Sequence, residues 1–138
     1  MPYQIQQLND HLIFIVWRRT PAKREAEKFI EELKGILEKA ANPLYFLSDL
    51  RRGRIITVSV LRELGLLSHH PNLAGSAGFT RDPMSQLFAG TYHKMLTSTA
   101  EKNLIFDEPD EALAFLETMA QGITEKINWQ QLLTKNLP

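Results

Sequence analysis

Residues 42–64 read NPLYFLSDLRRGRIITVSVLREL, and they join a strand pattern directly to a helix pattern. The apolar run Leu44–Leu47 predicts a short buried strand, whereas Val58–Leu64 repeats apolar residues at the spacing of a helix face. The arginine loop, Arg51–Arg54, lies between them. A strand that opens into a helix leaves backbone N–H groups unpaired at its carboxyl end, where α/β proteins commonly bind ligands. This stretch therefore predicts an α/β fold with a candidate site at the bend.

The composition is typical of a globular chain that is long enough, at 138 residues, for one domain with its own core. Sixteen Lys and Arg balance 16 Asp and Glu, and a formal charge of zero argues against non-specific nucleic-acid binding. The sequence has no cysteine, which excludes disulfides and thiol catalysis and fits the cytoplasmic location that we expect. The longest apolar run, Leu12–Trp17, is too short to span a bilayer.

Two strand patterns precede the opening stretch. Tyr3–Leu8 alternates loosely with glutamines, and Asn9 and Asp10 are turn formers, so we expect a hairpin. His11–Arg18 is rich in β-branched and aromatic residues, which predicts a strand buried on both faces.

Helix starts are indicated by a hydroxyl or carboxylate cap followed by proline, or by a run of acidic residues. These signatures predict helices beginning at Thr20–Pro21, at Asp82–Pro83 with a stripe from Met84 to Leu96, and at Asp107–Glu111. Gly65 is predicted to end the helix that follows the arginine loop, with Leu66 and Leu67 packing back over its end.

Two more strands complete the predicted sheet. Leu73–Phe79 is rich in small residues and predicts a thin central strand, and Leu104–Phe106 predicts the last strand. The order is strand-strand-helix-strand-helix-strand-helix-strand-helix. We therefore expect an α/β domain over residues 1–121, with a single mixed sheet of about five strands covered by helices. Residues 122–138 form an amphipathic tail, expected to dock on this domain or on a second copy.

Two segments resemble the STAS domain and its SpoIIAA-like relatives, which include sulfate-transporter and anti-sigma-factor-antagonist domains and are grouped with the SEC14-related, lipid-binding superfamily. FLSDLRRGRIITVSVLREL (46–64) is similar to the family's strand, variable loop and helix, and LIFDEPDEALAFL (104–116) is similar to its last strand and final helix start. The resemblance covers residues 3–120. It implies the same α/β fold and a regulatory role in the bacterial cytoplasm.

The chain departs from the family where the family is phosphorylated. The family's Ile-Asp-Ser-Ser-Gly-Leu core falls on Ile56, Thr57, Val58, Ser59, Val60 and Leu61. Val58 therefore stands at the position of the phosphoacceptor serine and cannot carry a phosphate. Thr57 or Ser59 could replace it, although a hydroxyl near a helix start more often serves as a cap.

The candidate binding residues gather at the bend: Asp49, Arg51, Arg52, Gly53, Arg54, Thr57 and Ser59. Guanidinium groups beside the free N–H groups of a helix start suit a phosphate or a carboxylate, or a charged surface of a protein partner. The competing interpretation is a solvated loop that binds nothing.

No other motif predicts chemistry. Adjacent histidines such as His69 and His70 rarely converge on one ion, so we expect no metal site and no cofactor. Gly75–Gly78 lacks the Lys-Ser/Thr ending of a phosphate loop and is interpreted as a packing strand. Ser48–Asp49 has neither a nucleophile elbow nor a convergent base, so we do not expect an enzyme.

The leading hypothesis is a non-catalytic cytoplasmic interaction or regulatory module that binds a protein partner. The alternative is a carrier or sensor of a small anionic or apolar, lipid-like ligand, with Met84, Phe88, Tyr92 and Met95 lining a cavity. A homodimer is also expected, through an edge strand or through the Trp129 tail. Neither nucleic-acid binding nor a membrane span is expected.

Overall fold

A computed structural model describes residues 2–53, 58–83 and 103–135, and of residues 58, 59, 61 and 103 it describes the backbone alone. Five strands form one mixed sheet in the order β1-β2-β3-β4-β5. Their bounds are Tyr3–Gln7, Leu12–Trp17, Leu44–Asp49, Leu73–Phe79 and Asn103–Phe106. β1 runs antiparallel to β2, and each later pair of neighbours is parallel. The predicted fold class, an α/β domain with a single mixed sheet of five strands, is confirmed.

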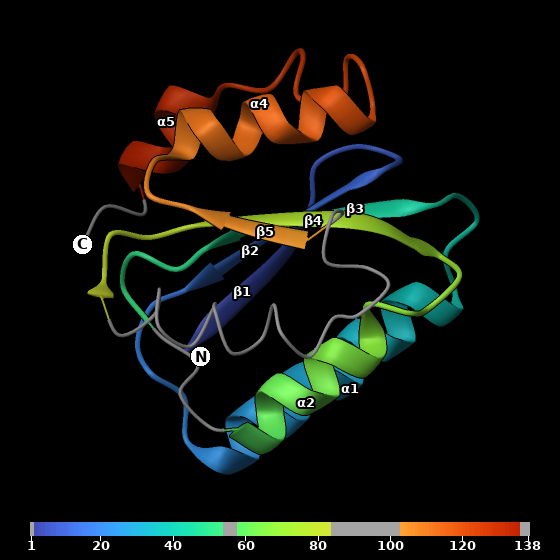
Figure 1. Cartoon of the computed structure of the whole chain (residues 1–138), viewed down its shortest axis with the longest axis vertical. Coiled ribbons are helices and arrows are strands. Elements are labelled where there is room, and N and C mark those ends of the chain that lie inside the picture. Colours follow the sequence, from blue (N-terminus) through green and yellow to red (C-terminus); the bar gives the residue numbers. More distant parts are fainter. Residues whose placement is uncertain (1, 54–57, 84–102, 136–138) are drawn as a thin grey trace.

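Helices cover both faces of the sheet (Figure 1). α1 (Lys23–Glu38) and α2 (Val58–Leu67) lie side by side on one face, and α4 (Pro109–Met119) and α5 (Trp129–Lys135) lie on the other. The crossovers β2-α1-β3 and β3-α2-β4 each join adjacent parallel strands. Crossover connections between parallel strands are right-handed, and both of these run in the same direction across the sheet. Both helices therefore fall on the same face.

The core is divided by the sheet into two clusters, and β2 contributes to both because all six of its residues are buried. Ile13, Ile15 and Trp17 pack against α1, while the residues between them face α4 and α5. Beneath α1, the Trp17 ring lies 4.5 Å from the Phe29 ring and 5.2 Å from the Tyr3 ring, between centroids. This run is buried on both faces, as its composition predicts.

The C-terminal segment packs on the sheet of its own chain. Ile123 is buried, and the Trp129 ring meets the Phe14 ring edge-on with centroids 6.0 Å apart. The Glu117 carboxylate holds the turn into this segment, since it accepts hydrogen bonds from the Thr124 hydroxyl at 2.5 Å and from the Gly122 N–H at 2.7 Å. These bonds, the Thr124 hydroxyl first, lower the pKa of Glu117. The domain boundary at residue 121 stays a prediction.

Two helix ends differ from the predicted ones. α1 begins at Lys23 rather than directly after Thr20, because the Glu25 carboxylate, not a hydroxyl, accepts a hydrogen bond from the N–H of the capping residue Ala22. α2 continues to Leu67 instead of ending at Gly65. The cost of glycine within a helix, about 1 kcal/mol, is outweighed by burying Leu67 in the core.

Leu66, which we expected to pack over that helix end, is instead 63% exposed. The strands and the acidic start of α4 agree with prediction, and Glu111 Oε1 accepts a hydrogen bond from the Glu108 N–H there at 3.2 Å. The helix predicted from Asp82, with its stripe from Met84 to Leu96, lies largely outside the described residues.

Tyr3 links β1 to α1, and its hydroxyl makes the stability of the fold depend on pH in the alkaline range. Its hydroxyl donates to Glu32 Oε1 at 2.9 Å, and burial together with this carboxylate raises its pKa from 10.0 to about 12. A raised pKa means that the neutral phenol stabilises the fold below pH 10 and that this contribution is lost as the pH rises through 12.

We expect Tyr3→Phe to flatten the loss of stability between pH 10 and 12, and to remove a tyrosinate absorbance step near pH 12. Chemical unfolding at several pH values, with Tyr45→Phe as the control, measures the first effect. A tyrosinate step near pH 12 that persists in Tyr3→Phe would contradict this assignment.

Candidate functional site

The described part of the arginine loop, Arg51–Gly53, lies at the carboxyl edge of the sheet, where the parallel strands β2 to β5 all end. β3 ends at Asp49, whose side chain is 1% exposed. Strand alternation turns this carboxylate to the face covered by α4 and α5. Arg51 pairs with it bidentately, with Nε 2.9 Å from Oδ1 and Nη2 2.7 Å from Oδ2. The Arg51 N–H also donates to Oδ1, at 3.1 Å.

Arg51 reaches beyond Asp49 to two other elements. Its Nη2 donates to the carbonyl oxygen of Leu133, in α5, at 2.9 Å. Its guanidinium carbon lies 5.3 Å from the centre of the Phe79 ring, at the end of β4, within cation–π range. One side chain thus ties β3, β4 and α5 together. The charge of Arg51 is engaged inside the fold and is not free for a ligand.

Gly53 fixes the other end of the described loop. A Cβ built at this glycine would lie 2.5 Å from the backbone oxygen of Arg19 and 3.0 Å from the Cβ of Trp17. Glycine is required here because no other residue allows the two backbones to approach so closely. The arginine loop is therefore held against the connection between β2 and α1.

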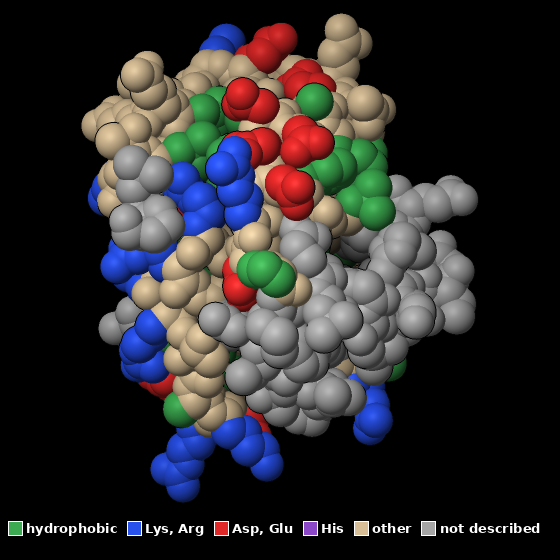
Figure 2. Space-filling view, turned by 60° about the vertical axis from the view of Figure 1, so that its left-hand side comes forward, with side chains coloured by type: hydrophobic (Ala, Val, Ile, Leu, Met, Phe, Trp, Pro, Cys, Tyr) green, Lys and Arg blue, Asp and Glu red, His purple; other side chains and the backbone are tan. Residues whose placement is uncertain are grey.

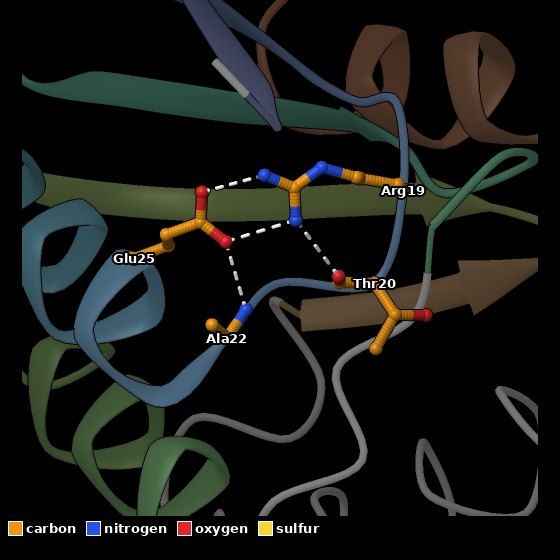
Figure 3. A network of polar contacts seen from close by, with 4 residues as sticks. All are labelled: Arg19, Thr20, Ala22 and Glu25. Atoms are coloured by element: carbon orange, nitrogen blue, oxygen red, sulfur yellow. Dashed lines mark hydrogen bonds and ion pairs between the residues drawn. The ribbon is translucent and has the colours of Figure 1, made fainter.

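That connection is itself ordered by an ion pair (Figure 3). Arg19 Nη1 and Nη2 donate to the two carboxylate oxygens of Glu25 at 2.9 and 2.7 Å, and Nη1 also contacts the Thr20 carbonyl oxygen at 3.4 Å. The hydrogen bond from Arg19 lowers the pKa of Glu25, and the Ala22 N–H adds to this effect. Arg19 is therefore a second arginine at this edge whose charge is matched by a carboxylate.

Arg52 is different from both. It is exposed, and within the described part of the chain it forms no ion pair or hydrogen bond. Arg54 and Thr57 lie outside the described residues, and Ser59 lies in the first turn of α2 without a described side chain. Of the seven predicted site residues, the structure therefore brings together Asp49, Arg51, Arg52 and Gly53, with Arg52 as the exposed one.

Charges of both signs lie at the same edge of the sheet as Arg52. Arg81, just after β4, forms an ion pair with Glu108, the N-cap of α4. Asp110 and Glu111 follow in the first turn of the same helix. Figure 2, which brings this side forward, shows acidic side chains gathered beside a group of basic ones. Sequence reasoning did not find Arg81, although an arginine directly after an apolar strand is a signal for an edge position.

The remaining candidates show no converging chemistry. Within the described ranges, no group of three or more His, Cys, Asp and Glu residues could hold a metal ion. His70 Nδ1 accepts a hydrogen bond from the Asn72 N–H at 3.1 Å and so belongs to the turn before β4. Gly75 and Gly78 lie inside β4, as the packing interpretation predicts. The predicted apolar lining from Met84 to Met95 lies outside the described residues.

A shallow groove of about 530 Å³ lies at the opposite edge, between the β1–β2 turn and the end of α4. Asn9 Nδ2 already donates to the Ile123 carbonyl oxygen at 2.9 Å, and His11 Nδ1 lies 3.2 Å from the Pro43 carbonyl oxygen. The polar groups of this groove are thus partly engaged by the backbone. The carboxyl edge is the better candidate site.

Comparison with protein-family models and with curated proteins gives no match. Among solved structures, the chain is similar to the crystal structure of an uncharacterized protein of the DUF3478 family, with a SpoIIAA-like fold, from Shewanella loihica PV-4. The TM-score is 0.57 at 13% identity, over 83% of this chain and 91% of that one. A likeness at this identity shows the fold alone. The chain therefore has a SpoIIAA-like fold, as its resemblance to these domains predicts.

The structure also bears on the membrane expectation. Among the described helices, none is long and apolar enough to cross a bilayer.

Replacing Arg51 should destabilise the protein far more than replacing its neighbour. Arg51→Met leaves the buried Asp49 carboxylate unpaired, and we expect a loss of about 3 kcal/mol in the free energy of unfolding. Arg52→Met, the matched control, should change it by less than about 0.5 kcal/mol. Adding Asp49→Asn to Arg51→Met should recover part of the loss. Urea unfolding measures all three, and equal effects of the two arginine substitutions would show that Arg51 does not hold this edge.

Proposed function

We propose that this protein is a non-catalytic interaction module of the cytoplasm, which binds a protein partner through the carboxyl edge of its sheet. The contact surface comprises the arginine loop, with Arg52 at its centre, and the start of α2. The observation that carries this proposal is the contrast between Arg52 and the two arginines whose charges are matched within the fold. Arg52 alone of the three is exposed and unpaired within the described residues.

The backbone on either side of Arg52 supports a binding role. Arg51 is held by the Asp49 carboxylate and the Leu133 carbonyl, and Gly53 is held against Arg19. A cation presented between two fixed residues loses little backbone freedom when a partner binds. Preorganisation of this kind favours affinity because less ordering is required on association.

The surrounding charges favour a protein over a nucleic acid. Arg81 and Arg52 contribute positive charge, while Glu108, Asp110 and Glu111 contribute negative charge to the same edge. A nucleic-acid surface requires an excess of positive charge, and the net charge of this chain is zero. A mixed surface matches a protein surface with the complementary pattern, which provides specificity and steering.

The proposal involves no chemical step. The Asp49 carboxylate, the acid among the predicted site residues, is buried and paired with Arg51, so it is not presented to a substrate. Val58 stands where related domains carry their phosphoacceptor serine, so partner binding is proposed without that modification. Thr57 and Ser59 stay predicted substitutes.

Site-specific photo-crosslinking tests this surface. A photoreactive residue at position 52 should form a covalent adduct with one protein in cells, whereas the same residue at exposed Lys34 of α1 should not. With the purified partner, Arg52→Glu should weaken binding at least about tenfold, and Lys34→Glu should not. Adducts of equal yield at both positions, or none at position 52, would contradict the proposal.

The alternative function, a carrier or sensor of a small anionic ligand, draws on the same exposed guanidinium of Arg52. It predicts that phosphate raises the melting temperature of the wild type and of Lys34→Ala, but not of Arg52→Ala. For an apolar ligand, native mass spectrometry of purified protein should show a bound lipid. If phosphate has no effect on the melting temperature and the purified protein carries no bound lipid, the carrier or sensor function is contradicted, and the interaction module is the one of the two proposals that stands.

A further inference from the structure

A second surface with binding capacity is the outer edge of β1. β1 is an end strand of the sheet, and within the described residues it pairs with β2 alone (Figure 1). An edge strand presents backbone N–H and C=O groups that can pair with another strand. This edge lies at the opposite end of the sheet from β5. The acidic start of α4 follows β5 in the chain.

The hydrogen-bond register shows which residues of β1 point outward. The Arg18 N–H donates to the Pro2 carbonyl at 2.7 Å, and the Leu8 N–H donates to the Leu12 carbonyl at 2.9 Å. Bonded pairs alternate along an antiparallel ladder, so Gln4 and Gln6 also bond toward β2. Tyr3, Ile5 and Gln7 consequently direct their backbone N–H and C=O groups away from the sheet.

β1 lacks the usual protection of an edge. Natural edge strands avoid pairing by carrying a charge, a proline or a bulge. Tyr3–Gln7 reads YQIQQ, without charge or proline, and its five residues pair with β2 in an unbroken register.

We infer that β1 pairs with β1 of a second copy of this chain, antiparallel and about a two-fold axis at Ile5. This register sets Ile5 opposite Ile5 of the second copy and Tyr3 opposite Gln7. All of these residues have outward-pointing backbone groups, so the ladder can continue across the axis. An axis at Gln4 or Gln6 would also set outward-pointing residues opposite one another, but it would pair three residues of each β1 strand instead of all five, so the axis at Ile5 gives the longest ladder.

The side chains suit the same register. Gln4 stands opposite Gln6 of the second copy. Gln4 Oε1 already accepts a hydrogen bond from Arg18 Nη2 at 2.6 Å, but the Gln4 amide N–H groups can donate to the Gln6 side chain. No like charges meet, because β1 has none. Ile5 is partly buried against the cluster beneath α1, and Ile5 of the second copy would extend this apolar surface across the axis. The strand is thus self-complementary, which favours a second copy over an unrelated peptide.

Analytical ultracentrifugation tests the dimer with a matched pair of variants. The wild type should sediment at twice the mass of its 15.8 kDa chain. Ile5→Lys places two like charges at the axis and should weaken dimerisation at least about tenfold, while circular dichroism shows that the variant is folded. Leu66→Lys makes the same type of change at an exposed leucine of α2 and should leave the dimer intact.

Disulfide cross-linking tests the register, since the chain contains no cysteine of its own. Gln4→Cys combined with Gln6→Cys should give covalent dimers on oxidation, because these residues would form a close, non-hydrogen-bonded pair. Either substitution alone should not. A monomeric wild type, a dimer that persists in Ile5→Lys, or a double variant that fails to cross-link would overturn the inference. A foreign extended segment found at β1 would do the same, and none of these results bears on partner binding at Arg52.

Discussion

The buried ion pair between Asp49 and Arg51 is the contact on which the carboxyl edge of the sheet depends. A carboxylate that is 1% exposed is costly unless its charge is compensated, and Arg51 provides two side-chain hydrogen bonds and one backbone hydrogen bond. A further N–H of the guanidinium donates to α5, through the Leu133 carbonyl. The pair therefore orders the loop locally and also joins the last described helix to the sheet.

Of the three consecutive residues described in this loop, two hold the backbone in place and one is exposed to solvent. Arg51 faces inward, Gly53 contacts a neighbouring backbone, and Arg52 projects from between them. The two supporting residues explain why a loop that carries like charges holds a defined shape. They also explain why a cation remains available at the edge although Arg19, Arg51 and Arg81 there are already paired.

Most of the fold was predictable because its signals are local. The composition of β2 marks a strand buried on both faces, and the small residues of β4 mark a thin strand. The predicted end of α2 was wrong, because the burial of Leu67 in the core outweighs the local preference of Gly65 for ending a helix. The role of Arg51 could be predicted only in part. Its carboxylate partner is two residues away, but Leu133 is 82 residues away, and no local pattern indicates that contact. The close approach of Gly53 to Arg19 likewise depends on how two loops meet in space.

The division of the core by the sheet gives each layer its own fluorophore. Trp17 is fully buried among the aromatic rings beneath α1, whereas Trp129 packs on Phe14 from the other side and donates its indole N–H to the Thr124 carbonyl at 2.9 Å. The chain has two tryptophans, and they stand on opposite sides of a five-stranded partition. Emission from one indole therefore reports on the helices of the first half of the chain, and emission from the other reports on the C-terminal layer. Detachment of that layer alone would shift one spectral component and leave the other in place.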